Sequence, residues 1–174
     1  EAYVDFGAQS CVGLVPEYDN LLVVQTLSKS RSLAGLRVGF ALGSEQLVQG
    51  LERVKNSFNS YPLDKVALAG AKAAMQDRQA FETSRGEVIR VRAWARDKLL
   101  ALGFEVLDSA ANFLFARPGF MSADDVYLAL REKGVLVRYF SSPRIREYLR
   151  ITIGTQQDMD TLLQKLIEIK RDRD

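Results

Sequence analysis

Lys29 is the residue whose type and place in the sequence best suit covalent chemistry. It follows residues 20–26, a nearly continuous apolar run rich in β-branched side chains, which predicts a strand buried on both faces. Open parallel sheets bind ligands beside the carboxyl ends of their strands, so this pattern predicts the lysine at a ligand-binding edge. Loss of solvation there would favour the neutral amine, which attacks a carbonyl carbon and forms a Schiff base.

Hydroxyl groups and a guanidinium accompany this lysine along the chain. The side chains that we predict to bind an anion are Thr26, Ser28, Ser30 and Arg37. Two glycines, Gly35 and Gly39, would allow a close approach of the backbone. An aldehyde with a phosphate group would use the amine and the anion-binding side chains together. Pyridoxal 5′-phosphate (PLP) is the common cofactor of that kind, and it acts as an electron sink for carbanions. From these residues alone, an ordinary solvated loop is the alternative interpretation.

The composition excludes several kinds of chemistry within this sequence. It contains no histidine, which excludes Ser-His-Asp and Cys-His catalysis, a histidine general base and histidine-ligated zinc, and we predict no metal site. The single cysteine, Cys11, excludes an internal disulfide framework and suits a reducing compartment, so we expect a cytoplasmic protein. A net charge of +2 is too small to indicate nucleic acid or a membrane as a partner. The apolar stretches are shorter than a membrane span, and we find no signal peptide at the start.

The spacing of apolar residues predicts an α/β protein. We expect a boundary between two parts of the chain near residue 82. Before that point we expect a parallel sheet with strands at 20–26 and 36–42, then a helix capped by Ser44, and a second helix at 63–75. The apolar stripe of the capped helix consists of Leu47, Val48, Leu51 and Val54. A long helical stretch then continues to about residue 102, where Gly103 ends it.

The remaining residues predict a compact α/β unit of their own. The expected strands are 104–107, 112–116, 135–139 and 148–153, with one helix at 122–133 and a last one that begins at Thr155. Both helices begin with a predicted capping box, Ser122 with Asp125 and Thr155 with Asp158. The last helix is strongly amphipathic, which predicts that one of its faces packs in the core.

The residues around Lys29 also resemble a known signature. The run reads Ser28-Lys29-x-x-x-Leu33-Ala34-Gly35-Leu36-Arg37-x-Gly39. It resembles the PLP-lysine motif of the fold-type I aminotransferases (class I/II), in particular the histidinol-phosphate aminotransferase family. The resemblance implies that Lys29 holds PLP and that Ser28 and Arg37 bind its phosphate. The opening Glu1-Ala2-Tyr3 is similar to a family segment whose tyrosine hydrogen-bonds the phenolic oxygen of the cofactor.

Three later segments extend this resemblance over essentially the whole chain. Residues 149–155 are similar to the segment that supplies the family's carboxylate-binding arginine, here Arg150. Residues 134–138 match a segment whose arginine, here Arg138, faces the substrate phosphate, and residues 109–114 match a further segment. Arg150 also lies in an otherwise apolar predicted strand, which by itself favours a functional charge that binds a carboxylate.

The resemblance implies a division of the chain and an activity. Residues 1–82 would be the C-terminal part of the PLP-binding large domain, and residues 83–174 a small C-terminal domain. The activity would be transamination of histidinol phosphate with 2-oxoglutarate, which gives imidazole acetol phosphate and glutamate in histidine biosynthesis. The partners would be a small-molecule amino donor and a 2-oxo acid, and the full-length enzyme would be a homodimer.

One departure from the family pattern concerns the start of the chain. The sequence has no initiator Met, and the family's aspartate that pairs with the pyridine nitrogen would directly precede Glu1. Asp5 does not replace that aspartate, because it follows Tyr3 in the sequence. We therefore expect this chain to be the C-terminal portion of the enzyme, inactive alone because half of the cofactor pocket lies outside it.

Three alternatives stay open. Within the same fold, the chain could come from an aromatic or broad-specificity aminotransferase, or from a decarboxylase of an amino-acid phosphate. In a different class, it could be a non-catalytic folded fragment that binds no cofactor.

Overall fold

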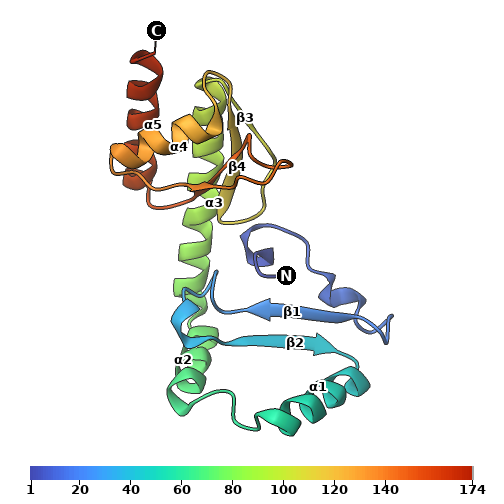
Figure 1. Ribbon diagram of the computed structural model, residues 1–174. Coiled ribbons are helices and arrows are strands. Elements are labelled where there is room, and N and C mark those ends of the chain that lie inside the picture. The colour runs from blue at the N-terminus through green and yellow to red at the C-terminus, as the bar shows by residue number, and fades with distance from the viewer. Residues whose placement is uncertain (174) are drawn as a thin grey trace. The chain divides into compact units, whose positions relative to one another are not determined.

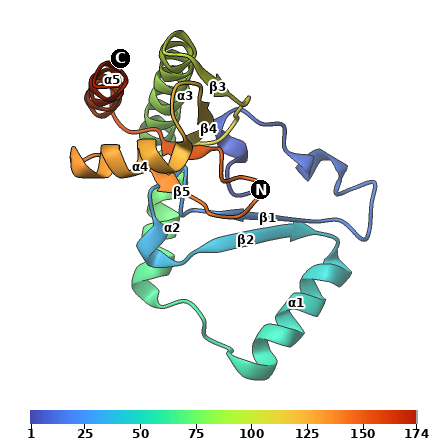
Figure 2. The same cartoon turned by 45° about the horizontal axis from the view of Figure 1, so that its top comes forward.

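The computed structural model describes residues 1–173, and the chain divides into two compact units, Glu1–Arg85 and Gly86–Asp174. The division falls inside one long helix, α3 (Arg78–Ala101), about one turn after the predicted boundary at residue 82. Figure 1 and Figure 2 show the elements in two orientations. No helix among the described residues has the length and apolar character needed to cross a membrane.

The first unit is built around a two-stranded sheet. Its strands are β1 (Leu22–Thr26) and β2 (Gly39–Gly43), and they pair antiparallel from Leu22 opposite Gly43 to Thr26 opposite Gly39. The prediction of a parallel sheet was therefore wrong for the described pair. A parallel pair needs a crossover connection, usually a helix, whereas residues 27–38 contain only the short 3₁₀ helix Ala34–Leu36.

The first strand is also less buried than its sequence suggested. Val23 is buried, but the side chain of Val24 is 54% exposed, so β1 is covered on one face only among the described residues. Two further 3₁₀ helices, Val4–Phe6 and Cys11–Leu14, precede the strand. Phe6 anchors the first of them because its side chain is almost fully buried.

Helix α1 (Glu45–Phe58) follows β2, and helix α2 (Lys65–Gln76) follows a loop. Ser44 lies at the predicted N-cap of α1, but its side chain accepts from no backbone amide of the first turn, and its hydroxyl donates instead to the carbonyl of Asp19. The predicted hydrogen bond of the cap was therefore wrong. Asp64 is the true cap of α2, where its carboxylate accepts from the amide of Ala67.

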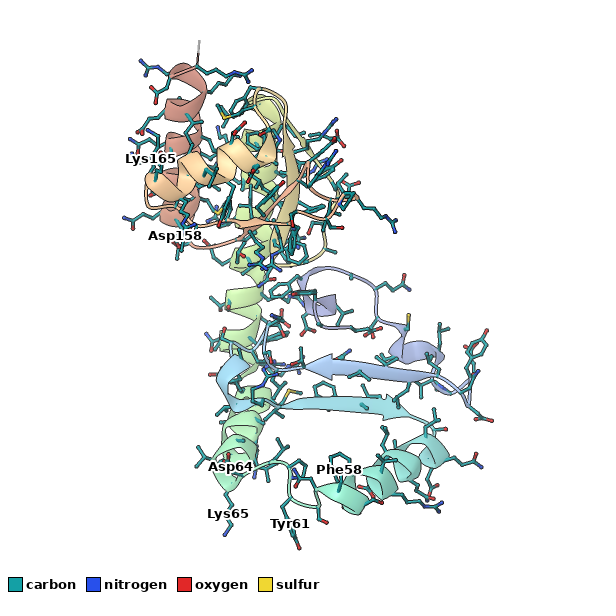
Figure 3. The ribbon with its side chains drawn as sticks, viewed as in Figure 1. Phe58, Tyr61, Asp64, Lys65, Asp158 and Lys165 are labelled. Atoms are coloured by element: carbon teal, nitrogen blue, oxygen red, sulfur yellow. The ribbon has the colours of Figure 1, made fainter. Side chains whose placement is uncertain are left out.

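Apolar side chains of the first unit remain uncovered. The predicted stripe of α1 has no buried member, and Leu51 and Val54 are exposed. Phe58, the last residue of α1, and Tyr61, in the loop that follows, have 80% and 91% of their surface exposed (Figure 3). The buried cluster of this unit is small: it consists of Leu27, Val38 and Ala67.

The second unit has a larger core. Its strands are β3 (Phe104–Val106), β4 (Phe113–Pro118), β5 (Arg138–Tyr139) and β6 (Leu149–Thr152), which pair antiparallel in the order β3-β4-β6-β5. The later turns of α3 and helices α4 (Ala123–Glu132) and α5 (Gln156–Arg171) pack their apolar faces into one cluster with the sheet. The predicted strand at 135–139 is shorter than expected and begins only at Arg138.

The caps of the second unit follow the sequence closely. Thr155 and Asp158 form the complete capping box of α5, in which each side chain accepts from the other residue's backbone amide. At α4, the Ser122 hydroxyl accepts from the amide of Asp125, but the Asp125 carboxylate accepts from the Ser122 hydroxyl and not from the Ser122 amide, so the box is incomplete. Figure 3 shows Asp158 at the first turn of α5.

Candidate functional site

Lys29 lies just beyond the last residue of β1, as the sequence predicted. Its ammonium nitrogen is 5.6 Å from the ring centroid of Tyr3, which makes the phenol its aromatic neighbour. Tyr3 is half-buried and immediately precedes the 3₁₀ helix Val4–Phe6. The Lys29 side chain is exposed in the described chain, so the expected loss of solvation is not provided by the described residues.

Two of the predicted hydroxyl groups shape the exit from the strand. The hydroxyl of Thr26 accepts from the amide of Ser28 at 3.1 Å, and it lies 2.9 Å from the Ser28 oxygen, to which it can donate. The carbonyl of Val38 is a second acceptor for Thr26, at 3.3 Å. This turn directs the chain from β1 into the loop. When Thr26 donates to Ser28, the hydroxyl hydrogen of Ser28 is available to another acceptor.

The third predicted hydroxyl has a different partner. Ser30 is buried, and its hydroxyl donates to the carboxylate of Asp5. A hydroxyl whose hydrogen is held by a carboxylate cannot offer it to a second anion, so the prediction that Ser30 binds an anion was wrong.

Arg37 lies at the far end of the same loop, in a backbone conformation that is unfavourable for it. Its φ of 55° is in the left-handed region, and Ser32 has a similar φ of 56°. Such angles cost free energy in residues other than glycine and persist where the surroundings require them, often at ligand sites. The Arg37 guanidinium is exposed and donates to the carbonyl of Ala34 at 3.1 Å.

The two glycines of the motif differ in their surroundings. A Cβ on Gly39 would lie 2.8 Å from the carbonyl oxygen of Gln25, so the close approach of the β1 and β2 backbones requires glycine. A Cβ on Gly35 would meet no atom within 4 Å, which leaves open space beside this part of the loop.

Glu1 is a residue that the sequence analysis missed. Its carboxylate accepts from the amide of Cys11 at 2.7 Å, from the hydroxyl of Ser10 at 2.7 Å and from the side chain of Gln25 at 3.0 Å. These bonds, the one from the Cys11 amide above all, lower the pKa of Glu1 from its ordinary value. Because Gln25 belongs to β1, the carboxylate ties the segment that contains Tyr3 to the strand that leads to Lys29.

In the second unit, the two predicted arginines lie directly opposite each other. Arg138 on β5 pairs with Arg150 on β6 in the strand register. The ring of Phe140 is 5.3 Å from the Arg138 guanidinium carbon and 5.9 Å from that of Arg150, and Phe113 is 5.7 Å from Arg150.

This arginine pair has no acidic partner among the described residues. The Nε atom of Arg150 is buried and makes no hydrogen bond, while Arg138 is exposed. Like charges directly opposite on neighbouring strands repel each other, and a buried donor without an acceptor is costly. An anion bound by both guanidinium groups would offset both costs.

Arg92 of α3 is another partly buried arginine of the second unit, and the sequence analysis overlooked it. Its guanidinium donates to the carbonyl of Ala111 at 2.6 Å, next to the loop that leads to Phe113. Burial lowers its pKa from the ordinary arginine value. The available signal was its position beside Val91 on the apolar face of the helix.

Comparison with known proteins assigns the family. Residues 1–166 match the family model described as aminotransferase class I and II, and the chain belongs to this family. The chain is 59% identical to histidinol-phosphate aminotransferase 1 of Bordetella parapertussis and 56% identical to the histidinol-phosphate aminotransferase of Marinomonas sp., over 97% and 95% of this chain. In both cases it covers 48% of the relative, so the chain spans about half the length of the curated relatives it matches.

Solved structures support the fold. The histidinol-phosphate aminotransferase of Clostridium acetobutylicum superposes with a TM-score of 0.86 at 20% identity, over 99% of this chain and 53% of that one. The enzyme of Sinorhizobium meliloti, solved in complex with pyridoxal-5′-phosphate, superposes with a TM-score of 0.84 at 22% identity, over 100% of this chain and 48% of that one. These superpositions confirm the predicted α/β fold class of the fold-type I transferases.

Proposed function

We propose that the full-length protein is a PLP-dependent aminotransferase that converts histidinol phosphate and 2-oxoglutarate to imidazole acetol phosphate and glutamate. The observation that supports the chemistry most directly is the Lys29 amine at the end of β1, 5.6 Å from the ring of Tyr3. The choice of substrate is supported by the names of the relatives that are 56–59% identical over nearly the whole chain.

The donor groups of the first unit fit PLP. Lys29 offers a primary amine for the aldehyde, Tyr3 offers a phenol beside that amine, and the Ser28 hydroxyl has a hydrogen to donate. The open space at Gly35 leaves room next to the loop. PLP, when bound, acts as an electron sink for the negative charge that develops on the substrate α-carbon.

Each of these side chains has a distinct role in the proposal. Lys29 holds the cofactor. Once free, its Nζ takes the proton from the α-carbon of the substrate and delivers it to C4′, the carbon of the cofactor's aldehyde group. Ser28 and Arg37 bind the phosphate through a hydroxyl and a guanidinium, the donors that phosphate oxygens prefer. Thr26 holds Ser28 in place through the turn described above, and Tyr3 donates to the phenolic oxygen.

The arginines of the second unit bind the anionic end of the substrate. Arg150 takes the carboxylate of glutamate, and Arg138 and Arg150 together take the phosphate of histidinol phosphate. The two arginines occupy opposite positions of the strand register and have no acidic partner among the described residues, which supports this role because a bidentate anion would neutralise both charges.

The remaining parts of the proposal concern organisation and location. Residues 1–82 belong to the PLP-binding large domain, and residues 83–174 form the small domain. The full-length enzyme works as a homodimer in the cytoplasm, in histidine biosynthesis, on small molecules. The single cysteine suits that reducing compartment.

The test uses the full-length enzyme and three reactions. Purified enzyme with PLP is assayed for amino transfer from histidinol phosphate, for amino transfer from aromatic amino acids, and for release of CO₂ from an amino-acid phosphate. We expect the highest kcat/KM for histidinol phosphate. A higher kcat/KM for an aromatic amino acid, or CO₂ release in place of amino transfer, would contradict the proposed substrate. Absence of a visible cofactor absorbance band would contradict the enzyme class.

A further inference from the structure

The residue after Lys29 is fixed to the segment that contains Tyr3. Ser30 is only 7% exposed, although its neighbour Lys29 is exposed. Among the described residues, Ser30 is the one polar residue that is buried. Its hydroxyl donates to the carboxylate of Asp5, which lies in the 3₁₀ helix Val4–Phe6, two residues after Tyr3. One hydrogen bond thus connects the two backbone segments from which the Lys29 and Tyr3 side chains extend.

The opposite side of the same loop is fixed by the next residue. The guanidinium carbon of Arg31 lies 3.6 Å from the ring centroid of Phe81, and its Nη1 donates to the carbonyl of Ala74 at 2.6 Å. Phe81 and Ala74 belong to α3 and α2. Arg31 therefore holds the loop against the two helices. On its other side, the loop is held to the segment that contains Tyr3 by the Asp5–Ser30 bond.

We propose that Asp5 and Ser30 are positioning residues, whose hydrogen bond sets the place of the Lys29 amine over Tyr3. This inference rests on the proposed function, in which Lys29 holds PLP. Asp5 acts through Ser30, since it forms no ion pair with Lys29 among the described contacts. A hydrogen bond to a carboxylate in a half-buried place is stronger than one between neutral groups, which suits it to hold a loop. Without it, the loop residues beside Lys29 would lose their direct bond to the Tyr3 segment, and the bond from Gln25 to Glu1 would remain on the strand before them.

The test measures cofactor binding by the full-length apoenzyme. The variants are Asp5→Ala, Ser30→Ala and the double variant, and the readouts are the Kd of PLP and the melting temperature without PLP. We expect each single variant to raise the Kd of PLP about tenfold, the order of effect of one hydrogen bond to a charged group. The double variant should be no worse than the poorer single variant, because both changes remove the same bond.

Two further variants separate positioning from a general loss of structure. Asp5→Asn keeps an oxygen that accepts from Ser30, so it should restore most of the lost PLP affinity relative to Asp5→Ala. Ser32→Ala is the matched control, because Ser32 is an exposed serine of the same loop that makes no side-chain hydrogen bond in the described structure. It should leave the Kd of PLP within about twofold of the wild type.

Kinetics of the loaded enzyme give a second readout. A displaced Lys29 amine should lower kcat about tenfold in Ser30→Ala while the KM for glutamate stays within about twofold, because the arginines that bind the carboxylate are untouched. Variants that melt at a lower temperature but keep the wild-type Kd and kcat would overturn the inference, as would additive effects in the double variant. A wild-type protein that binds no PLP would contradict the proposed function itself, and with it this inference.

Discussion

At the scale of single residues, the environment of Arg150 is the most informative feature of the second unit. It lies opposite Arg138, between the rings of Phe113 and Phe140, and its Nε is buried without a partner. No carboxylate among the described residues compensates its charge. A buried donor without an acceptor, opposite a second positive charge, raises the free energy of the folded chain. This cost favours a role in which a bound anion accepts hydrogen bonds from Arg150.

Substitution of Arg150 by lysine in the full-length enzyme tests this role. Lysine keeps the charge but loses the planar fork that binds a carboxylate with two hydrogen bonds. We expect the KM for glutamate to rise more than tenfold, or at least about 1.4 kcal/mol, with little change in melting temperature. A lower melting temperature with an unchanged KM would show that Arg150 has a structural partner.

Arg117→Lys is the control for this variant. Arg117 lies on β4 of the same sheet, is exposed, and already forms ion pairs with Glu105 and Glu147. Exposed pairs of this kind contribute little, so both the KM for glutamate and the melting temperature should change only slightly.

At the scale of the elements, the close pairing of β1 and β2 depends on one glycine. The missing Cβ of Gly39 is what allows the Gln25 carbonyl to approach, whereas Gly35 has open space around it. Gly39→Ala should therefore lower the free energy of unfolding of the full-length apoenzyme by about 1–3 kcal/mol, measured by denaturant titration. Gly35→Ala should change it by less than about 1 kcal/mol. Equal effects of the two variants would contradict the described strand register.

The capping box of α5 makes stability depend on pH. The Asp158 carboxylate accepts from the hydroxyl and the amide of Thr155, and these bonds lower its pKa below the ordinary value. Its contribution is therefore complete above the pKa of an unfolded aspartate, about 3.9, and is lost as the pH falls through the lower pKa of the folded chain.

We expect Asp158→Asn to reduce the loss of stability on acidification, measured as the melting temperature of the full-length enzyme from pH 5 to pH 2. The difference should arise as the pH falls from the pKa of an unfolded aspartate, about 3.9, through the lower pKa of the folded chain. Asp160→Asn is the control, because Asp160 is an exposed aspartate of the same helix with no side-chain partner in the described structure. A steeper acid loss in Asp158→Asn than in the wild type would contradict the cap.

The elements also show which features the sequence could predict. The cap of α5 at Thr155 and the end of β1 at Thr26 depend on neighbouring residues, so local patterns were sufficient to place these two features. The antiparallel pairing of β1 with β2, and the Ser30–Asp5 bond, join residues far apart along the chain. No local pattern contains that information, and for this reason the sheet direction and the role of Ser30 were predicted wrongly.

At the scale of the whole chain, the two units differ in how much apolar surface they bury. The second unit shares one large core among its sheet and three helices, whereas the first unit buries a cluster of Leu27, Val38 and Ala67 and leaves the apolar side of α1 exposed. Because burial of apolar surface is the main stabilising contribution to folding, the two units should differ in stability.

We expect the chain of residues 1–174, expressed alone, to show strong hydrogen-exchange protection in β4, β6 and α5 and weak protection in β1 and β2. The same chain should bind PLP weakly and show negligible transamination, because catalytic groups act as a unit. The full-length enzyme, measured in parallel, is the control. Activity of the chain alone close to that of the full-length enzyme would contradict this expectation, and so would uniform protection.

The candidate site was predictable to different degrees at this scale. Lys29, Ser28 and Arg37 belong to one continuous motif, and Tyr3 and Arg150 were found by resemblance of their own segments. Glu1 and Arg92 were missed because their roles depend on partners on other elements, the strand residue Gln25 and the loop carbonyl of Ala111.

The central claim is that Lys29 is the residue that binds PLP covalently. The most direct measurement is borohydride reduction of the full-length enzyme with PLP, followed by mass spectrometry of its peptides. We predict that the adduct is on the peptide that contains Lys29 and that it is lost in Lys29→Ala. This variant should keep part of its non-covalent affinity for PLP. An adduct on a different lysine, or its persistence in Lys29→Ala, would contradict the account.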